Sequence, residues 1–132
     1  MIAFSLISPE RVLLERPVSM AVLPGIEGDM GILPNHSPLI TLLRPGTITL
    51  YDQEEITMKM FVEGGFAEVT PETCTVLVTA GIPVDRLNKD TLDIEIQTLL
   101  DNKAHSSTPE EQKKIDKNLT IARAKLMELL SH

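Results

Sequence analysis

The sequence has 132 residues, 42% of them hydrophobic, which is enough for one domain with a real core and a short appendage. Its net charge of −7 and its 3% of aromatic residues exclude the basic surface and the stacking platform of a nucleic-acid-binding protein. No stretch approaches the ~20 consecutive apolar residues of a membrane-spanning helix, and no basic leader precedes an apolar segment, so we expect no secretory signal.

The first 80 or so residues alternate between apolar and polar. A period of two predicts half-buried strands. Turn residues such as Pro24-Gly25, Pro45-Gly46 and Gly64-Gly65 separate the runs. Short strands at spacings of roughly ten residues predict an antiparallel sandwich or barrel. The alternating runs are Ile2-Phe4-Leu6, Val18-Met20-Val22, Ile48-Leu50, Ile56-Met58-Met60-Val62 and Val76-Val78.

After Gly81-Ile82-Pro83 the period changes to that of a helix. One apolar stripe consists of Leu92, Ile96, Leu99 and Leu100, and a second of Ile115, Leu119, Ala122, Leu126, Leu129 and Leu130. Thr108, Pro109 and Glu111 form a capping box that starts the second helix. We therefore expect a sandwich over residues 1–86, followed by a separable, antiparallel two-helix hairpin over residues 87–132.

Catalytic and metal-binding residues are sparse. The three histidines, His36, His105 and His132, are far apart, so no metal-ligand spacing exists, and we expect no cofactor. The single cysteine, Cys74, cannot form an internal disulfide, fits a reducing cytoplasm and reads as a packed thiol. A small hydrolase using Asp29 and His36 is a minor hypothesis.

The second helix carries an excess of basic residues. Lys113, Lys114, Lys117, Arg123 and Lys125 stand against Asp116 alone between positions 113 and 125. Two interpretations stay open: a solvated outer face that the helix dipole favours, or a basic surface that meets an acidic protein.

One segment, EGDMGILPNHSPLITLLRPG, closely resembles the segment by which the epsilon subunit of bacterial F-type ATP synthases is recognised. The resemblance covers the whole chain, because SPERVLLE precedes this segment, GTITLY and VEGGFAEVTPETCTVLV follow it, and a helical hairpin ends the chain. It implies a ten-stranded sandwich that docks on the gamma subunit and on the membrane-embedded ring of c subunits, as part of the rotor that couples proton flow to ATP synthesis.

The same resemblance implies a non-catalytic subunit, held peripherally at the cytoplasmic face of the bacterial inner membrane only through the complex. Its hairpin can extend toward the alpha and beta subunits of the catalytic head and hinder ATP hydrolysis. Whether this hairpin is folded or extended stays open, as does the coupling ion.

Site residues follow from the resemblance position by position. Asp29 takes the place of the acidic turn residue that faces the c ring, with Met30 beside it. His36 and Ser37 fall in the loop near the gamma and ring contacts. The four residues matched to contacts with acidic segments of the beta subunit are Lys113, Lys114, Lys117 and Arg123.

One departure concerns nucleotide binding. Some members of this family bind ATP at the hairpin through a motif of the form Ile/Leu-Asp-x-x-Arg-Ala. Here Leu92 and Asp93 match the motif, but Ile96 stands where the arginine would pair with phosphate. Loss of that charge-assisted contact costs on the order of 1.5–3 kcal/mol, so we expect weak or absent ATP binding. An ATP-sensing module whose hairpin closes on nucleotide is the alternative function.

Overall fold

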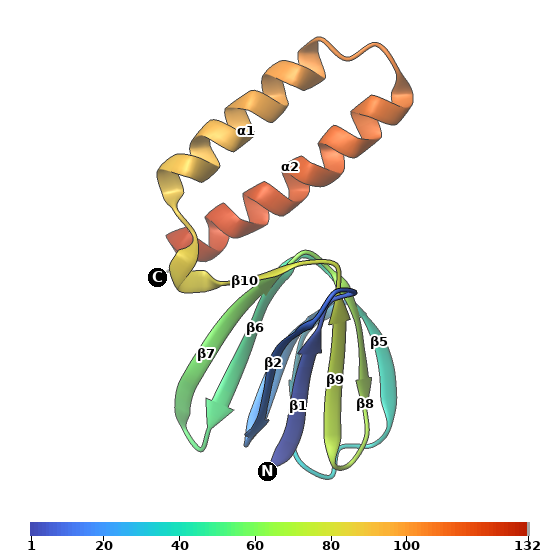
Figure 1. Ribbon diagram of the computed structural model, residues 1–132, viewed down its shortest axis with the longest axis vertical. Coiled ribbons are helices and arrows are strands. Elements are labelled where there is room, and N and C mark those ends of the chain that lie inside the picture. The colour runs from blue at the N-terminus through green and yellow to red at the C-terminus, as the bar shows by residue number, and fades with distance from the viewer. Residues whose placement is uncertain (132) are drawn as a thin grey trace. The chain divides into compact units, whose positions relative to one another are not determined.

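The structure is a computed structural model that describes residues 1–131. The chain divides into two compact units, residues 1–85 and the chain from Arg86 onward, as Figure 1 illustrates. The first unit contains ten strands: β1 (Ile2–Ile7), β2 (Val12–Val18), β3 (Met20–Gly25), β4 (Gly28–Ile32), β5 (Leu39–Leu43), β6 (Gly46–Asp52), β7 (Glu55–Val62), β8 (Gly65–Val69), β9 (Thr73–Val78) and β10 (Gly81–Pro83).

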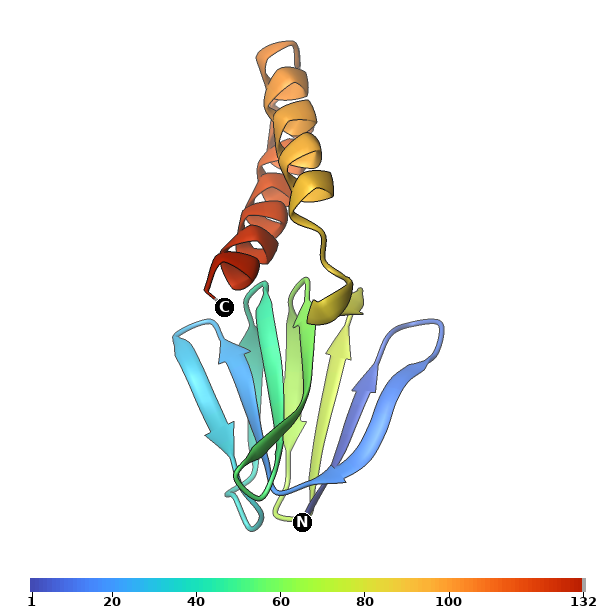
Figure 2. The ribbon, with the colours of Figure 1, turned by 90° about the vertical axis from the view of Figure 1, so that its left-hand side faces the viewer.

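These strands hydrogen-bond in the order β10-β7-β6-β3-β5-β8-β9-β1-β2, and β4 pairs with β3. The sheet folds over at β3, because Ala21 in its first half faces Leu50 of β6 whereas Gly25 at its end faces Leu43 of β5. In Figure 1, β7 and β6 lie on the left of the sandwich and β9, β8 and β5 on the right, and Figure 2 looks onto the face that contains β7 and β6. Among the described residues every strand pair is antiparallel except β1 with β9. The predicted sandwich of about ten strands is confirmed.

The core follows the period of two along most strands. Ile2, Phe4 and Leu6 are all fully buried, while the residues between them are not. Burial of each such side chain stabilises the fold by about 1.5–3 kcal/mol relative to exposure. Cys74 and Val76 extend the same layer on β9, where they face Phe4 and Leu6 across the parallel pair.

One predicted run has the wrong phase, and a second departs from its predicted phase only at its first residue, since Met60 and Val62 on β7 are buried. Val18 is the last residue of β2, and Ser19 turns the chain, with its hydroxyl donating a 2.9 Å hydrogen bond to the carbonyl oxygen of Tyr51. β3 therefore begins in the opposite phase, so Ala21 is buried and Met20 is only half-buried. On β7, Ile56 is 51% exposed because the pairing with β6 shifts register near the hairpin end.

The second unit is a helical hairpin, as predicted. A short 3-10 turn (Val84–Arg86) precedes α1 (Lys89–Ala104) and α2 (Pro109–Leu130). The Oγ1 of Thr108 accepts a 3.2 Å hydrogen bond from the amide of Glu111, which is one half of the predicted capping box. Lys103 on α1 and Asp116 on α2 form a 2.8 Å ion pair across the hairpin. No helix within residues 1–131 is long and apolar enough to cross a membrane.

Candidate functional site

The connection between β3 and β4 is a tight turn with little freedom to vary. Gly28 has a φ of +140°, a backbone conformation that side chains disfavour. A Cβ atom on Gly25 would lie 2.7 Å from the carbonyl oxygen of Gly28, so only glycine fits there. The amide of Ile26 also donates a 3.1 Å hydrogen bond to the carbonyl oxygen of Leu42 on β5. The turn is therefore fixed before any partner arrives.

Asp29 follows this turn and is held from the β5–β6 connection. Its Oδ1 accepts a 2.6 Å hydrogen bond from Nη2 of Arg44, and the two residues form an ion pair. Arg44 also donates from Nη1 to the carbonyl oxygen of Gly25 at 2.5 Å. The side chain of Asp29 remains 63% exposed. It can thus reach a partner while its orientation is set by Arg44.

A hollow of about 380 Å³ adjoins the turn. Its walls combine the acidic turn with the apolar side chains of Ile26, Met30, Ile40 and Leu42. Ile40 is 73% exposed and Leu42 is 58% exposed. Large apolar side chains so open to water at one place are typical of a surface that another protein covers.

His36 lies at the other end of β4 from Asp29. The loop that carries it is fastened to the β8–β9 turn by a 2.8 Å hydrogen bond from the amide of Asn35 to the carbonyl oxygen of Pro71. Nδ1 of His36 lies 2.7 Å from the carbonyl oxygen of the neighbouring Ser37. β4 lies between Asp29 and His36, and the carboxylate of Asp29 pairs with Arg44, so Asp29 and His36 do not form an acid–histidine pair.

Metal ligands are not grouped in the part of the chain that the structure describes. Within residues 1–131, no group of three or more histidine, cysteine or acidic side chains is placed so that it could hold a metal ion. Of the three histidines considered above, His132 lies outside the described residues. Cys74 is fully buried, and this burial raises the pKa of its thiol from 9.0 to about 12, which disfavours the reactive thiolate.

An apolar row crosses the outer face of five strands. Leu42 on β5 faces Phe66 on β8, Phe66 faces Leu77 on β9, Leu77 faces Ile7 on β1, and Ile7 faces Val12 on β2. Phe66 is 42% exposed and Val12 is 53% exposed. We call these five residues the apolar row. It begins at Leu42, which also lines the hollow beside Asp29, so the two features are continuous.

On β8, β9 and β1 the next outward positions are polar and border the row, whereas on β5 that position is the apolar Ile40. Glu68 on β8 faces Thr75 on β9, and Thr75 faces Ser5 on β1. An apolar centre with a polar margin is the usual composition of a protein–protein interface. Sequence reasoning missed this surface. The available signal was the occurrence of large apolar residues at both inward and outward positions of β5, β8 and β9.

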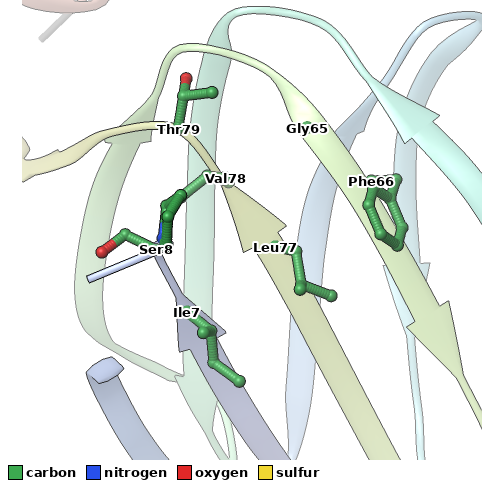
Figure 3. Close-up of a pocket in the computed structure, with 8 residues that line it drawn as sticks. Ile7, Ser8, Gly65, Phe66, Leu77, Val78 and Thr79 are labelled. Carbon is green, nitrogen blue, oxygen red and sulfur yellow. The ribbon is translucent and has the colours of Figure 1, made fainter. Parts of the chain in front are cut away.

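A second hollow, of about 500 Å³, opens on the apolar row (Figure 3). Figure 3 shows the side chains of Ile7, Leu77 and Phe66 on three neighbouring strands. Pro9 and Val78 complete the apolar part of its lining. A recess of this kind on an apolar surface suits a large apolar side chain of a partner protein.

Comparison with known proteins identifies the family. The family described as the beta-sandwich domain of the ATP synthase delta/epsilon chain matches residues 1–84. The ATP synthase epsilon chain of Rhodospirillum rubrum is 40% identical over 110 residues, which cover 83% of this chain and 81% of that protein. This chain belongs to the ATP synthase epsilon chains. The resemblance noted in the sequence is thereby confirmed.

Further relatives agree over nearly the full length. The epsilon chain of Rhodospirillum centenum is 40% identical over 128 residues, covering 93% of this chain and 88% of the relative. A chain in the cryo-EM structure of the Euglena gracilis mitochondrial ATP synthase superposes with a TM-score of 0.82 at 21% identity, covering 99% of this chain and 81% of that chain. At that identity the likeness shows the fold, which includes both units.

The exposed basic residues of α2 are spread around the helix axis. Lys113, Lys114 and Lys117 are exposed and lie within about 100° of one another around the helix axis. Arg123 is also exposed and lies about 80° from Lys113 around the axis, but about 120° from Lys117 and about 180° from Lys114. A partner that contacts the three lysines as one surface would therefore not contact Arg123 in the same way.

The residues matched to the ATP motif are buried, partly buried or paired with another residue of the hairpin. Leu92 is buried and Ile96 is half-buried. Nζ of Lys89 lies 2.8 Å from Oδ2 of Asp93, one helical turn away. The hydrogen bond and charge of Asp93 raise the pKa of Lys89, and the contact in turn occupies the carboxylate of Asp93.

Proposed function

We propose that this chain is the epsilon subunit of the central stalk of an F-type ATP synthase, where it couples rotation of the c ring to ATP synthesis without being catalytic itself. The observation that carries the proposal is the continuous exposed surface that starts at the Asp29 turn and follows the apolar row to Val12. A rigid turn beside a broad apolar face loses little entropy on docking, which suits a part that transmits torque.

Two contacts are assigned on this surface. The Asp29 turn, with Met30, meets the c ring, and the apolar row with its hollow meets the gamma subunit. His36 and Ser37 lie at the opposite end of β4, so any contact that they make with gamma is a separate one. In this role the chain would be peripheral to the cytoplasmic face of the bacterial inner membrane and held there through the complex.

The helical hairpin is assigned a regulatory role. The exposed Lys113, Lys114 and Lys117 present positive charge that an acidic surface of the catalytic head can attract. No observation favours the ATP-sensing alternative, because Asp93 is paired with Lys89 and Ile96 offers no donor to phosphate.

Replacement of one apolar-row residue by serine tests the proposal. Phe66→Ser should weaken binding to a gamma–c-ring subcomplex by about tenfold or more, since a buried aromatic anchor is lost. Ile56→Ser is the matched control, because Ile56 is 51% exposed on β7 and lies outside the row. Binding by the unsubstituted chain that neither variant changes would contradict the assigned surface, and failure of the unsubstituted chain to bind would contradict the function.

A further inference from the structure

Arg44, on the β5–β6 connection, contacts three residues of the β3–β4 turn, which precedes it in the sequence by at least 15 residues. Its amide donates a 2.9 Å hydrogen bond to the carbonyl oxygen of Pro24, at the end of β3. Its guanidinium donates to the carbonyl oxygen of Gly25 at 2.5 Å and to the carboxylate of Asp29 at 2.6 Å. One side chain therefore fixes both the entrance and the exit of the β3–β4 turn.

A side chain with a single charged nitrogen could not make both contacts of Arg44, to Gly25 and to Asp29, in the same geometry. The two contacts of Arg44 use separate nitrogens of one planar guanidinium, Nη1 and Nη2. A lysine carries a single ammonium group on a flexible stem and cannot reproduce that fork. The geometry thus uses the shape of arginine as well as its charge.

Charge is the second consequence of this arrangement. The pair of Asp29 and Arg44 is neutral, although both side chains remain partly exposed, at 63% and 42%. Because the carboxylate of Asp29 is already paired with Arg44, a binding partner does not need a positively charged side chain to balance it. Its recognition then depends on shape and hydrogen bonding, and only weakly on ionic strength.

We propose that Arg44 is a positioning residue, which orders the β3–β4 turn and neutralises Asp29 so that the turn docks as a preformed, charge-paired unit. This inference rests on the proposed function in taking the turn as a docking element. The ordering of the turn in the free chain depends only on the contacts of Arg44 and not on the proposed function.

Binding of the full chain to a gamma–c-ring subcomplex, measured at several salt concentrations, tests the proposal. Arg44→Gln should weaken binding about two- to fivefold, in line with a partly exposed ion pair. It should also alter the salt dependence, because the charge of Asp29 is released. The double variant Arg44→Gln with Asp29→Asn should regain the salt dependence of the unsubstituted chain, which a merely structural defect would not allow. Arg44→Lys should restore the salt dependence but not the full affinity.

Arg86→Gln is the control, since it removes one exposed positive charge outside the strands. Amide hydrogen exchange in the free chain gives an independent measurement: the amides of Gly25 to Asp29 should exchange faster in Arg44→Gln and unchanged in Arg86→Gln. If the unsubstituted chain fails to bind, the proposed function is wrong, and the hydrogen-exchange result alone then decides whether Arg44 orders the turn. Unchanged exchange, or a salt dependence that Arg44→Gln leaves unaltered, overturns the role of Arg44.

Discussion

Gly65 permits β8 and β9 to lie closer together than any other residue would. It has a φ of +149°, and a Cβ atom placed on it would lie 2.1 Å from the carbonyl oxygen of Leu77. Both the backbone conformation and the lack of space therefore require glycine. The same residue lines the hollow on the apolar row, so its absence of a side chain also shapes the surface assigned to gamma.

Gly65→Ala should lower the free energy of unfolding of the sandwich by about 2–4 kcal/mol, from backbone strain together with the forced separation of two strands. Gly31→Ala is the matched control. A Cβ atom there would meet only the Sδ of Met20, at 3.5 Å, so the change should stay below about 1 kcal/mol. Urea denaturation followed by circular dichroism measures both. Equal stability of the two variants would contradict the steric account.

The Cys74 thiol makes the stability of the sandwich depend on pH in the alkaline range. Its pKa is about 12 in the folded chain against 9.0 when unperturbed, so above pH 9 the unfolded state loses a proton that the folded state retains. The contribution is fully present below pH 9 and is lost as the pH rises toward 12. The slope reaches up to about 1.4 kcal/mol per pH unit.

Comparison of the unsubstituted chain with Cys74→Ala isolates this effect from other groups that titrate at high pH. The difference in unfolding free energy between the two should change between pH 9 and 12 and be constant between pH 6 and 8. A difference that does not vary with pH would show that the thiol is accessible to water in the folded chain.

At the scale of the element, the sequence predicts those features of strands and helices that depend only on neighbouring residues. The alternation Ile2-Phe4-Leu6 and the cap at Thr108 depend on neighbouring residues only, and both agree with the structure. The predicted phase of β3 was wrong because the alternation predicts one strand over the run Val18-Met20-Val22, whereas Ser19 turns the chain between β2 and β3.

The apolar row shows why a surface built from several strands could not be predicted from the sequence. Leu77 meets Ile7 through parallel pairing of strands about 70 residues apart, and Leu42 meets Phe66 through a separate ladder. Their adjacency depends on register across the whole sheet, which no local period contains. Asp29 was likewise grouped with His36 by sequence distance, whereas β4 carries them to opposite ends.

At the scale of the whole molecule, the two compact units predict separable roles. Ending the chain after Leu87 should leave a sandwich that unfolds cooperatively and still binds the gamma–c-ring subcomplex, because the core and the apolar row lie within residues 1–85. If the hairpin hinders hydrolysis, the reconstituted complex should gain ATPase activity on truncation. Circular dichroism, binding and steady-state ATPase assays measure the three outcomes.

Charge reversal then separates electrostatic from steric hindrance by the hairpin. The triple variant of Lys113, Lys114 and Lys117 to Glu should reproduce the gain in ATPase activity if attraction to an acidic surface holds the hairpin in place. Arg123→Glu, on a different side of α2, should give a smaller gain. A truncated chain that leaves ATPase activity unchanged would remove the regulatory role, whereas one that no longer binds the subcomplex would contradict the assignment of docking to the sandwich. The two proposals can therefore fail independently, because each depends on a different unit of the chain.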